Sequence, residues 1–223
     1  MSGRDEVLAR VRAALRTAER SASEHELEPP PAYAPRVRPA TDPHELADRF
    51  AERVADYRAT VVRTDEAGVA EAVSAALADL EPATVAAPAG LPDAWRPAGA
   101  RDGGALDHAE LQTIGAIVTA CRTGIAETGT IVLDHGPDQG PRRLTLVPDR
   151  HVCVVRAEQI VDDVDDGFVA LRPETGEGAA HAPPLTFVSG PSATSDIELQ
   201  RVEGVHGPRT LVVVLVQPGA PPG

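Results

Sequence analysis

The sequence predicts an α/β fold built on an open, mostly parallel sheet with helices on both faces. Several apolar segments are continuous runs of valine, leucine and isoleucine, as in TLVVVLV at residues 210–216, instead of alternating patterns. Such runs are typical of strands covered on both faces. Strand-like and helix-like segments also alternate in the first half of the chain, the order expected when crossover helices join parallel strands. The 223 residues are enough for one domain with extensions.

Capping residues and apolar spacing predict three helices in this domain. Asp42 suits the N-cap of the first, Pro43 fits its first helical position, and Asp65 suits the N-cap of the second. The predicted buried residues of the first helix are Leu46, Phe50 and Val54, and those of the second are Val69, Val73, Leu77 and Leu80. Those of the third helix are Ile160, Val164, Phe168 and Leu171. Strands are expected at residues 59–64, 83–88, 115–120, 129–134, 151–156, 185–189 and 210–216.

A separate helix and a linker are expected ahead of this domain. Within residues 1–20, Val7, Leu8, Val11 and Leu15 recur at helical spacing with charges on the other face. Residues 21–40 hold five prolines and almost no apolar periodicity, which is typical of an extended linker. The α/β domain is predicted to span residues 41–218. The tethered helix is expected to dock on that domain or on a partner.

Composition excludes several classes of function. A formal net charge of −13 repels nucleic acid and anionic lipid, and 3% aromatic residues leave few platforms for stacking bases. No apolar run approaches the roughly 20 residues of a membrane span, and the N-terminus does not resemble a signal peptide, so a cytoplasmic location is expected. Cys121 and Cys153 are too few for an iron–sulfur cluster and are predicted to be buried thiols. The histidines show no metal-ligand spacing, so no metal site is expected.

The first candidate loop is RTGIAETGT at residues 122–130. Glu127 stands between an apolar Ile-Ala pair and a Thr-Gly-Thr segment, and carboxylates are scarce in apolar surroundings unless they are paired or functional. One interpretation is a hairpin-like turn in which Glu127 accepts from backbone N–H groups. The other is a site in which Glu127 is the catalytic residue and Thr128, Gly129 and Thr130 contact a ligand.

The second candidate loop, SGPSATSD at residues 189–196, follows a predicted strand. Ser195 and Glu198 form a capping box that predicts a helix beginning at Asp196. Capping leaves the other donors of this loop unexplained, and a ligand role would account for them. The candidate ligand residues are Ser189, Gly190, Ser192, Thr194 and Asp196.

The third candidate loop, EGVHGP at residues 203–208, places His206 next to Gly207. Glycine allows a backbone to approach a ligand closely, so both residues are candidates for ligand contact. His206 is equally interpretable as a structural hydrogen-bonding residue. Since ligands of parallel sheets bind beyond the carboxyl ends of strands, the three loops are predicted to form one pocket for a small anion.

A further polar run, GPRR at residues 140–143, leaves two interpretations open. Arg142 and Arg143 are either a surface pair or arginines directed at a carboxylate. The chain has no GxGxxG, Walker or GxSxG motif, so the common nucleotide-binding and hydrolase patterns are absent from the sequence.

Four segments resemble the LUD-domain family: IAETGT at 125–130, LVPDRHVCVV at 146–155, FVSGPSATSDIE at 187–198 and GVHGP at 204–208. The resemblance spans roughly residues 41–216. It implies a fold similar to the NagB/RpiA/CoA-transferase group and a cytoplasmic role in oxidising L-lactate to pyruvate. It also implies two iron–sulfur partner proteins that carry the clusters, with no cofactor in this chain.

The sequence therefore leaves three alternative functions open. In the first, the chain is a subunit of an L-lactate oxidation system, Glu127 is its polar or acid–base residue, and Glu127→Gln abolishes growth on lactate without unfolding the protein. In the second, the chain is an acyl-CoA transferase or hydrolase in which Glu127 attacks a thioester. In the third, it is a non-catalytic scaffold that docks through the helix within residues 1–20.

Overall fold

The computed structural model describes residues 3–24, 42–171, 184–195, 201–203 and 207–217. The chain divides into two units, Met1–Ala34 and Pro35–Gly223. The first contains helix α1 (Gly3–Glu24), whose Val7, Leu8, Val11 and Leu15 are all exposed. The predicted N-terminal helix is therefore confirmed, but it includes residues 21–24, which were assigned to the linker. The remainder of that linker lies outside the described residues.

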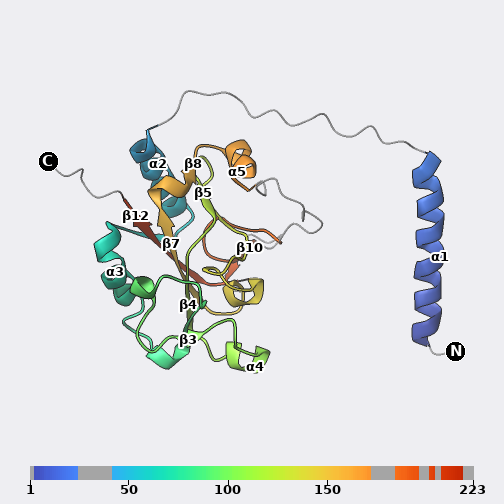
Figure 1. Cartoon of the computed structure of the whole chain (residues 1–223), viewed down its shortest axis with the longest axis horizontal. Coiled ribbons are helices and arrows are strands. Elements are labelled where there is room, and N and C mark those ends of the chain that lie inside the picture. The colour runs from blue at the N-terminus through green and yellow to red at the C-terminus, as the bar shows by residue number, and fades with distance from the viewer. Residues whose placement is uncertain (1–2, 25–41, 172–183, 196–200, 204–206, 218–223) are drawn as a thin grey trace. The chain divides into compact units, whose positions relative to one another are not determined.

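A six-stranded sheet forms the centre of the second unit (Figure 1). Every pairing within it is parallel, which confirms the interpretation of the continuous apolar runs. The short edge strand β3 is the one member that the sequence patterns did not predict. In spatial order the strands are β1 (Thr60–Thr64), β12 (Thr210–Val216), β7 (Arg150–Arg156), β4 (Ala116–Thr119), β2 (Val85–Ala87) and β3 (Arg101–Asp102).

Helices cover both faces of this sheet. Helix α2 (Pro43–Asp56) begins at Asp42, whose side chain accepts from the backbone N–H of His44, and it buries Phe50 against one face. Helix α3 (Val69–Ala76) follows a 3₁₀ turn η1 (Glu66–Gly68) and packs with Trp95 against the other face. Alternate residues of β7 belong to the two hydrophobic clusters, as the period of a strand requires.

A second sheet of four strands lies against the same face as α2. Its order is β8 (Ile160–Val161), β5 (Thr123–Ile125), β6 (Thr130–Leu133) and β9 (Thr186–Val188). Strand β6 is antiparallel to both β5 and β9. The strands predicted at 129–134 and 185–189 thus belong here and not to the parallel sheet, because Ile131 and Leu133 pack in the cluster that contains α2.

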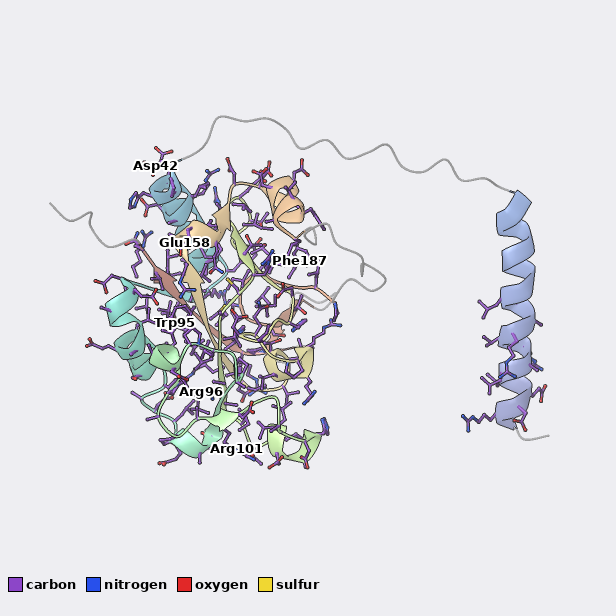
Figure 2. The ribbon with its side chains drawn as sticks, in the orientation of Figure 1. Asp42, Trp95, Arg96, Arg101, Glu158 and Phe187 are labelled. Atoms are coloured by element: carbon purple, nitrogen blue, oxygen red, sulfur yellow. The ribbon has the colours of Figure 1, made fainter. Side chains whose placement is uncertain are left out.

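The helix predicted across residues 160–171 is only partly correct. Residues Ile160 and Val161 form β8, and helix α5 (Val164–Ala170) begins after the N-cap Asp163. Its buried residue is Gly167, which lies against Ile125. Val164 and Phe168, predicted to face inward, are 38% and 52% exposed. The glycine lets α5 approach β5 on that side, and Phe168 on the exposed side packs against Phe187 with ring centroids 6.0 Å apart. Phe187 is labelled in Figure 2.

Strands β10 (Ala193–Ser195) and β11 (Arg201–Glu203) form an antiparallel pair after β9. Ser195, predicted to cap a helix, therefore lies in a strand and pairs with Arg201. Residues 196–200, where that helix was expected, lie outside the described residues.

The remaining elements are short. They are helix α4 (His108–Leu111) and the 3₁₀ turns η2 (Pro82–Thr84), η3 (Asp93–Trp95), η4 (Arg142–Thr145) and η5 (Ala157–Gln159). In the parts of the chain that the structure describes, no helix is long and apolar enough to cross a membrane.

Candidate functional site

A cavity of about 370 Å³ lies between the parallel sheet and strand β9. His151 and Leu211, the second residues of β7 and β12, form part of its wall, and β9 with the loop that follows it forms another part. We call it the β9 cavity. Its polar lining consists of Arg142, Thr145, His151, Thr186, Ser189 and Ser192.

The β9 cavity differs in charge from the rest of the molecule. The chain has 34 acidic and 21 basic residues, yet none of the described lining residues is acidic. The guanidinium of Arg142 forms no hydrogen bond or ion pair with a described residue, whereas Arg49 and Arg150 are paired with Asp162 and Asp79. One cationic group and several hydroxyls therefore face a space without a described counter-charge, which suits a small anion.

The cavity lies at the amino ends of β7 and β12, not beyond the carboxyl ends of the parallel strands as expected. The physical reason is the second sheet, which brings the carboxyl end of β9 to this place. Gly190 there has a φ of +88°, and a Cβ on it would lie 2.5 Å from Cβ of Tyr57, so only glycine fits. The N–H of Ser192 donates to the carbonyl of Pro208 at 2.7 Å and joins the second and third candidate loops.

The predicted site residues separate into three groups. Four of them, Ser189, Gly190, Ser192 and Gly207, line the β9 cavity. Another four do not line it: Glu127, Thr128, Gly129 and Thr130. For the last three, Asp196 and His206 lie outside the described residues, and of Thr194 only the strand β10 is described.

Residues 126–129 form the turn between β5 and β6, which confirms the predicted hairpin-like turn but shows no bond from a described backbone N–H to the Glu127 side chain. Glu127 is exposed and not in apolar surroundings, because its neighbours Ile125 and Ala126 point into the core. Its backbone N–H donates to the carbonyl of Asp162 at 2.9 Å. Gly129 has a φ of +59°, and a Cβ there would lie 2.7 Å from the backbone of α2. Turn and helix are therefore in close contact.

Hydroxyl groups connect this turn to the cavity wall. Oγ1 of Thr128 lies 2.7 Å from Oγ1 of Thr130, which lies 2.7 Å from Oγ of Ser189. Thr130 is buried, so its hydroxyl needs these partners. The first candidate loop thus supports Ser189 from behind without reaching the cavity itself.

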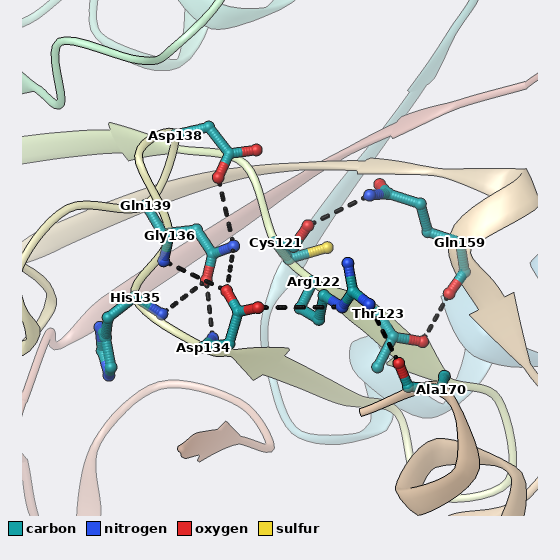
Figure 3. A network of polar contacts seen from close by, with 10 residues as sticks. All are labelled: Cys121, Arg122, Thr123, Asp134, His135, Gly136, Asp138, Gln139, Gln159 and Ala170. Atoms are coloured by element: carbon teal, nitrogen blue, oxygen red, sulfur yellow. Dashed lines mark hydrogen bonds and ion pairs between the residues drawn. The ribbon is translucent and has the colours of Figure 1, made fainter. Parts of the chain in front are cut away.

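The segment that leads to Arg142 is held by a buried glutamine (Figure 3). Oε1 of Gln139 accepts from the backbone N–H groups of Asp134 and His135 at 2.8 and 3.1 Å. Its Nε2 donates to Oδ1 of Asp134 at 2.9 Å. Arg122 approaches the other carboxylate oxygen of Asp134 at 3.8 Å. These contacts fix the turn that precedes η4 and therefore the backbone position of Arg142.

His135, in the same segment, contacts strand β9 through Thr186. It has a φ of +59°, in the left-handed region that few non-glycine residues adopt. Its Nε2 lies 2.8 Å from Oγ1 of Thr186, and Nδ1 lies 3.3 Å from the carbonyl oxygen of Gly140. Burial lowers the pKa of His135 from 6.5, and the nearby charge of Arg142 acts in the same direction. The imidazole is thus favoured in its neutral form.

Behind the cavity, His151 belongs to a buried polar group with Thr119 and the two cysteines. Nε2 of His151 lies 2.8 Å from Oγ1 of Thr119. Both cysteines are buried, as predicted, and they are hydrogen-bonded to each other. That bond and burial raise the pKa of Cys121 well above its ordinary value. The same bond lowers the pKa of Cys153, helped by His151 and Thr119 and opposed by burial.

Sequence patterns missed Thr145, His151 and Thr186 as lining residues of the cavity. The spacing of the histidines along the sequence indicates no role for His151. The signal that marks it is a histidine at the start of an otherwise apolar strand, HVCVVR, where burying an imidazole is costly without a partner. For Arg142 the sequence allows both a surface role and a role in binding a carboxylate, and the structure places it in the cavity lining. Among the described residues, no group of three or more histidine, cysteine or acidic side chains is arranged to hold a metal ion.

Comparisons with known proteins agree on one family. A model named LUD domain matches residues 93–216. The lactate utilization protein C of Deinococcus radiodurans is 47% identical over 175 residues, covering 77% of this chain and 80% of that protein. The protein of the same name from Geobacillus thermodenitrificans is 29% identical over 178 residues, covering 79% and 70%. The crystal structure of a DUF162 family protein from D. radiodurans superposes with a TM-score of 0.65 at 38% identity, covering 79% of this chain and 99% of that one.

Proposed function

Because this chain belongs to the LUD-domain family, we propose that it is a component of an L-lactate utilisation system and binds a small carboxylate in the β9 cavity. The reaction of the whole system is the oxidation of L-lactate to pyruvate. The role in lactate utilisation rests on the names of the similar proteins, and the ligand rests on the chemistry of the cavity.

The observation that carries the ligand is Arg142, whose guanidinium bonds to no described residue, in a cavity whose described lining has no carboxylate. A guanidinium can donate two parallel hydrogen bonds to a carboxylate. Ser189 lies in the same lining, and its hydroxyl, which Thr130 holds in place, adds a polar group to the cavity wall. Leu146, Phe187 and Leu211 provide apolar surface for a short carbon chain.

The redox centres are proposed to lie in iron–sulfur partner proteins. An iron–sulfur cluster needs about four protein ligands, mostly cysteines. Cys121 and Cys153 are this chain's two cysteines, and both are buried in the core and hydrogen-bonded to each other. The electrons removed from lactate would then pass to the partners, and this chain would hold the carboxylate.

Replacing Arg142 tests the proposed ligand. Arg142→Ala should weaken the binding of L-lactate and pyruvate to the purified chain about 10- to 100-fold, since a hydrogen bond to a charged group contributes about 1.5–3 kcal/mol. Isothermal titration calorimetry measures the affinity, and growth on lactate reports the function in cells.

The matched control is Arg143→Ala. Arg143 is the next residue, is also exposed, and donates to the carbonyls of Gly104 and Leu106 without lining the cavity. Equal affinities for the wild type and the Arg142 variant would contradict the assignment of the ligand to this cavity.

A second role, docking to the partners through α1, is favoured by one observation. Val7, Leu8, Val11 and Leu15 of this helix are 59%, 38%, 49% and 58% exposed. An exposed apolar stripe on a helix is suited to a groove on another protein. Deleting residues 1–40 should then abolish co-purification with the iron–sulfur proteins and leave carboxylate binding unchanged. Co-purification of the shortened chain would rule out this role for α1.

A further inference from the structure

The volume of the β9 cavity exceeds the volume that a small carboxylate occupies. The cavity measures about 370 Å³. A water molecule takes up about 30 Å³ in the liquid, so the cavity has room for roughly a dozen non-hydrogen atoms. L-lactate, with its three carbons and three oxygens, would fill only about half of this space. The rest is filled either by water or by a longer part of the ligand.

The charged and apolar parts of the lining differ in depth. Arg142 is exposed. By contrast, Thr145, His151 and Leu211 in the same lining are 3%, 1% and 3% exposed. The guanidinium is therefore on the solvent side of the cavity, and Leu211 is on its inner side. Leu211 is a member of the hydrophobic cluster that contains α2, and Val188 of β9 packs against the same cluster.

The buried polar side chains of the inner lining already have partners within the protein. Oγ1 of Thr145 donates to the carbonyl oxygen of Arg142 at 3.1 Å, and Nε2 of His151 lies 2.8 Å from Oγ1 of Thr119. In the described part of the chain, no buried side-chain nitrogen or oxygen lacks a partner. A polar group of a ligand would lose its hydration here without satisfying an unpaired atom. The inner space therefore suits the carbon atoms of a ligand.

We propose that the β9 cavity is selective for a monocarboxylate whose apolar chain is about three to six carbons longer than that of L-lactate. The inference rests on the proposed function, since Arg142 holds the carboxylate, and it names the class of ligand. The chain extends from Arg142 toward Val188 and Leu211, where burying each methylene removes apolar surface from water. The described lining contains one arginine and no lysine, so a second carboxylate would have no matching cation.

Calorimetry on the purified full-length chain tests this with 2-hydroxy acids that differ only in chain length. The probes are L-lactate and the L-forms of 2-hydroxybutanoate, 2-hydroxypentanoate and 2-hydroxyhexanoate, which carry the same charge. A fully buried methylene strengthens binding about fourfold, so 2-hydroxyhexanoate should bind at least about tenfold more tightly than L-lactate. Glycerate is the control ligand, because it has a hydroxyl where 2-hydroxybutanoate has a methyl group. It should bind no more tightly than L-lactate.

A variant with a larger side chain in the lining tests where the carbon chain lies. Val188→Phe adds a ring to the wall of the cavity and takes up the space of the chain. In this variant 2-hydroxyhexanoate should bind no more than about threefold more tightly than L-lactate, because most of the buried methylenes are displaced. Val61→Phe is the matched control and should retain the full gain. Val61 of β1 is also partly buried against the same cluster but does not line the cavity.

The outcomes distinguish this inference from the proposed function. Affinities that stay equal or fall along the series, measured on the wild type and so independent of any variant's folding, would overturn the selectivity and leave carboxylate binding intact. A gain that persists in Val188→Phe would overturn it as well, since the chain would then lie outside this cavity. Failure of the wild type to bind any acid of the series would overturn the proposed ligand and this inference together.

Discussion

The turn between β5 and β6 and the loop after β9 are alike in sequence and differ in the use of their polar groups. Residues 128–130 read Thr-Gly-Thr, and residues 189–192 read Ser-Gly-Pro-Ser. Both follow a strand and both contain a glycine with positive φ. The first packs against α2, and its threonine hydroxyls bond to one another and to Ser189. The second lines the β9 cavity.

The difference shows that a loop rich in donors is not by itself a ligand site. Hydrogen bonding does not separate the two loops, because Ser189 of the second loop is also bonded within the protein, to Thr130. What separates the two loops is the element packed against each. Helix α2 fills the space around the first, and beside the second there is a cavity of about 370 Å³.

The largest effect on stability is expected from adding a side chain at Gly129, where the turn contacts the backbone of α2. Gly129→Ala should lower the free energy of unfolding by about 3 kcal/mol, because its Cβ would meet the backbone of Arg53 and Val54 at a φ of +59°. Urea unfolding followed by the fluorescence of Trp95 measures this. Gly115→Ala is the control, since its Cβ meets only side-chain atoms at 3.5 Å or more. A loss below 1 kcal/mol for Gly129→Ala would contradict a structural role for the turn.

A smaller effect on stability is expected from His135, whose imidazole lies 2.8 Å from Oγ1 of Thr186 in β9. The pKa of His135 is lower in the folded state than its ordinary value of 6.5. As pH falls below 6.5 the unfolded chain binds a proton first, so the contribution of His135 to stability is lost between pH 6.5 and the lower folded pKa. Asparagine tolerates the left-handed conformation and does not titrate.

The stability difference between the wild type and His135→Asn should therefore narrow as pH falls from 7.5 to 5.5. Urea unfolding at a series of pH values provides the measurement. A difference that stays constant over this range would show that the imidazole does not remain neutral in the folded protein.

The smallest effect is expected at Glu127. The side chain is exposed on the turn and lies outside the cavity lining, so Glu127→Gln should change carboxylate affinity less than twofold and stability by less than about 0.5 kcal/mol. Calorimetry and urea unfolding provide the measurements. A large loss of affinity would contradict the distinction between the two loops and place the turn within the binding site. Loss of growth on lactate with unchanged affinity would assign Glu127 a role away from the cavity.

Much of the fold could be predicted from local patterns. The valine-rich runs predicted strands of a parallel sheet, and capping residues such as Asp42 predicted where helices begin. These predictions succeeded because side-chain periodicity and capping depend on neighbours along the chain. The helix across residues 160–171 was misplaced because its inward face was set by contact between Gly167 and Ile125, which are distant in sequence.

The candidate site was less predictable. Ser189, Gly190, Ser192 and Gly207 were identified from their loops and do line the cavity. His151 and Thr186 come from strands whose patterns indicated only burial, and Arg142 remained ambiguous in a polar run. Their meeting depends on the second sheet lying across the amino ends of β7 and β12, and no local pattern contains that arrangement.

By itself, the sequence determined the class of fold, the buried thiols and the segments that mark the LUD-domain family, since these depend on residue type and spacing. Tertiary structure alone decided which of the two similar loops faces a cavity and that His151 lies in the wall of that cavity. The reason is physical. A polar group can contact a ligand only where no other part of the chain fills the space beside it. Packing between segments that are distant in sequence determines where such a space remains.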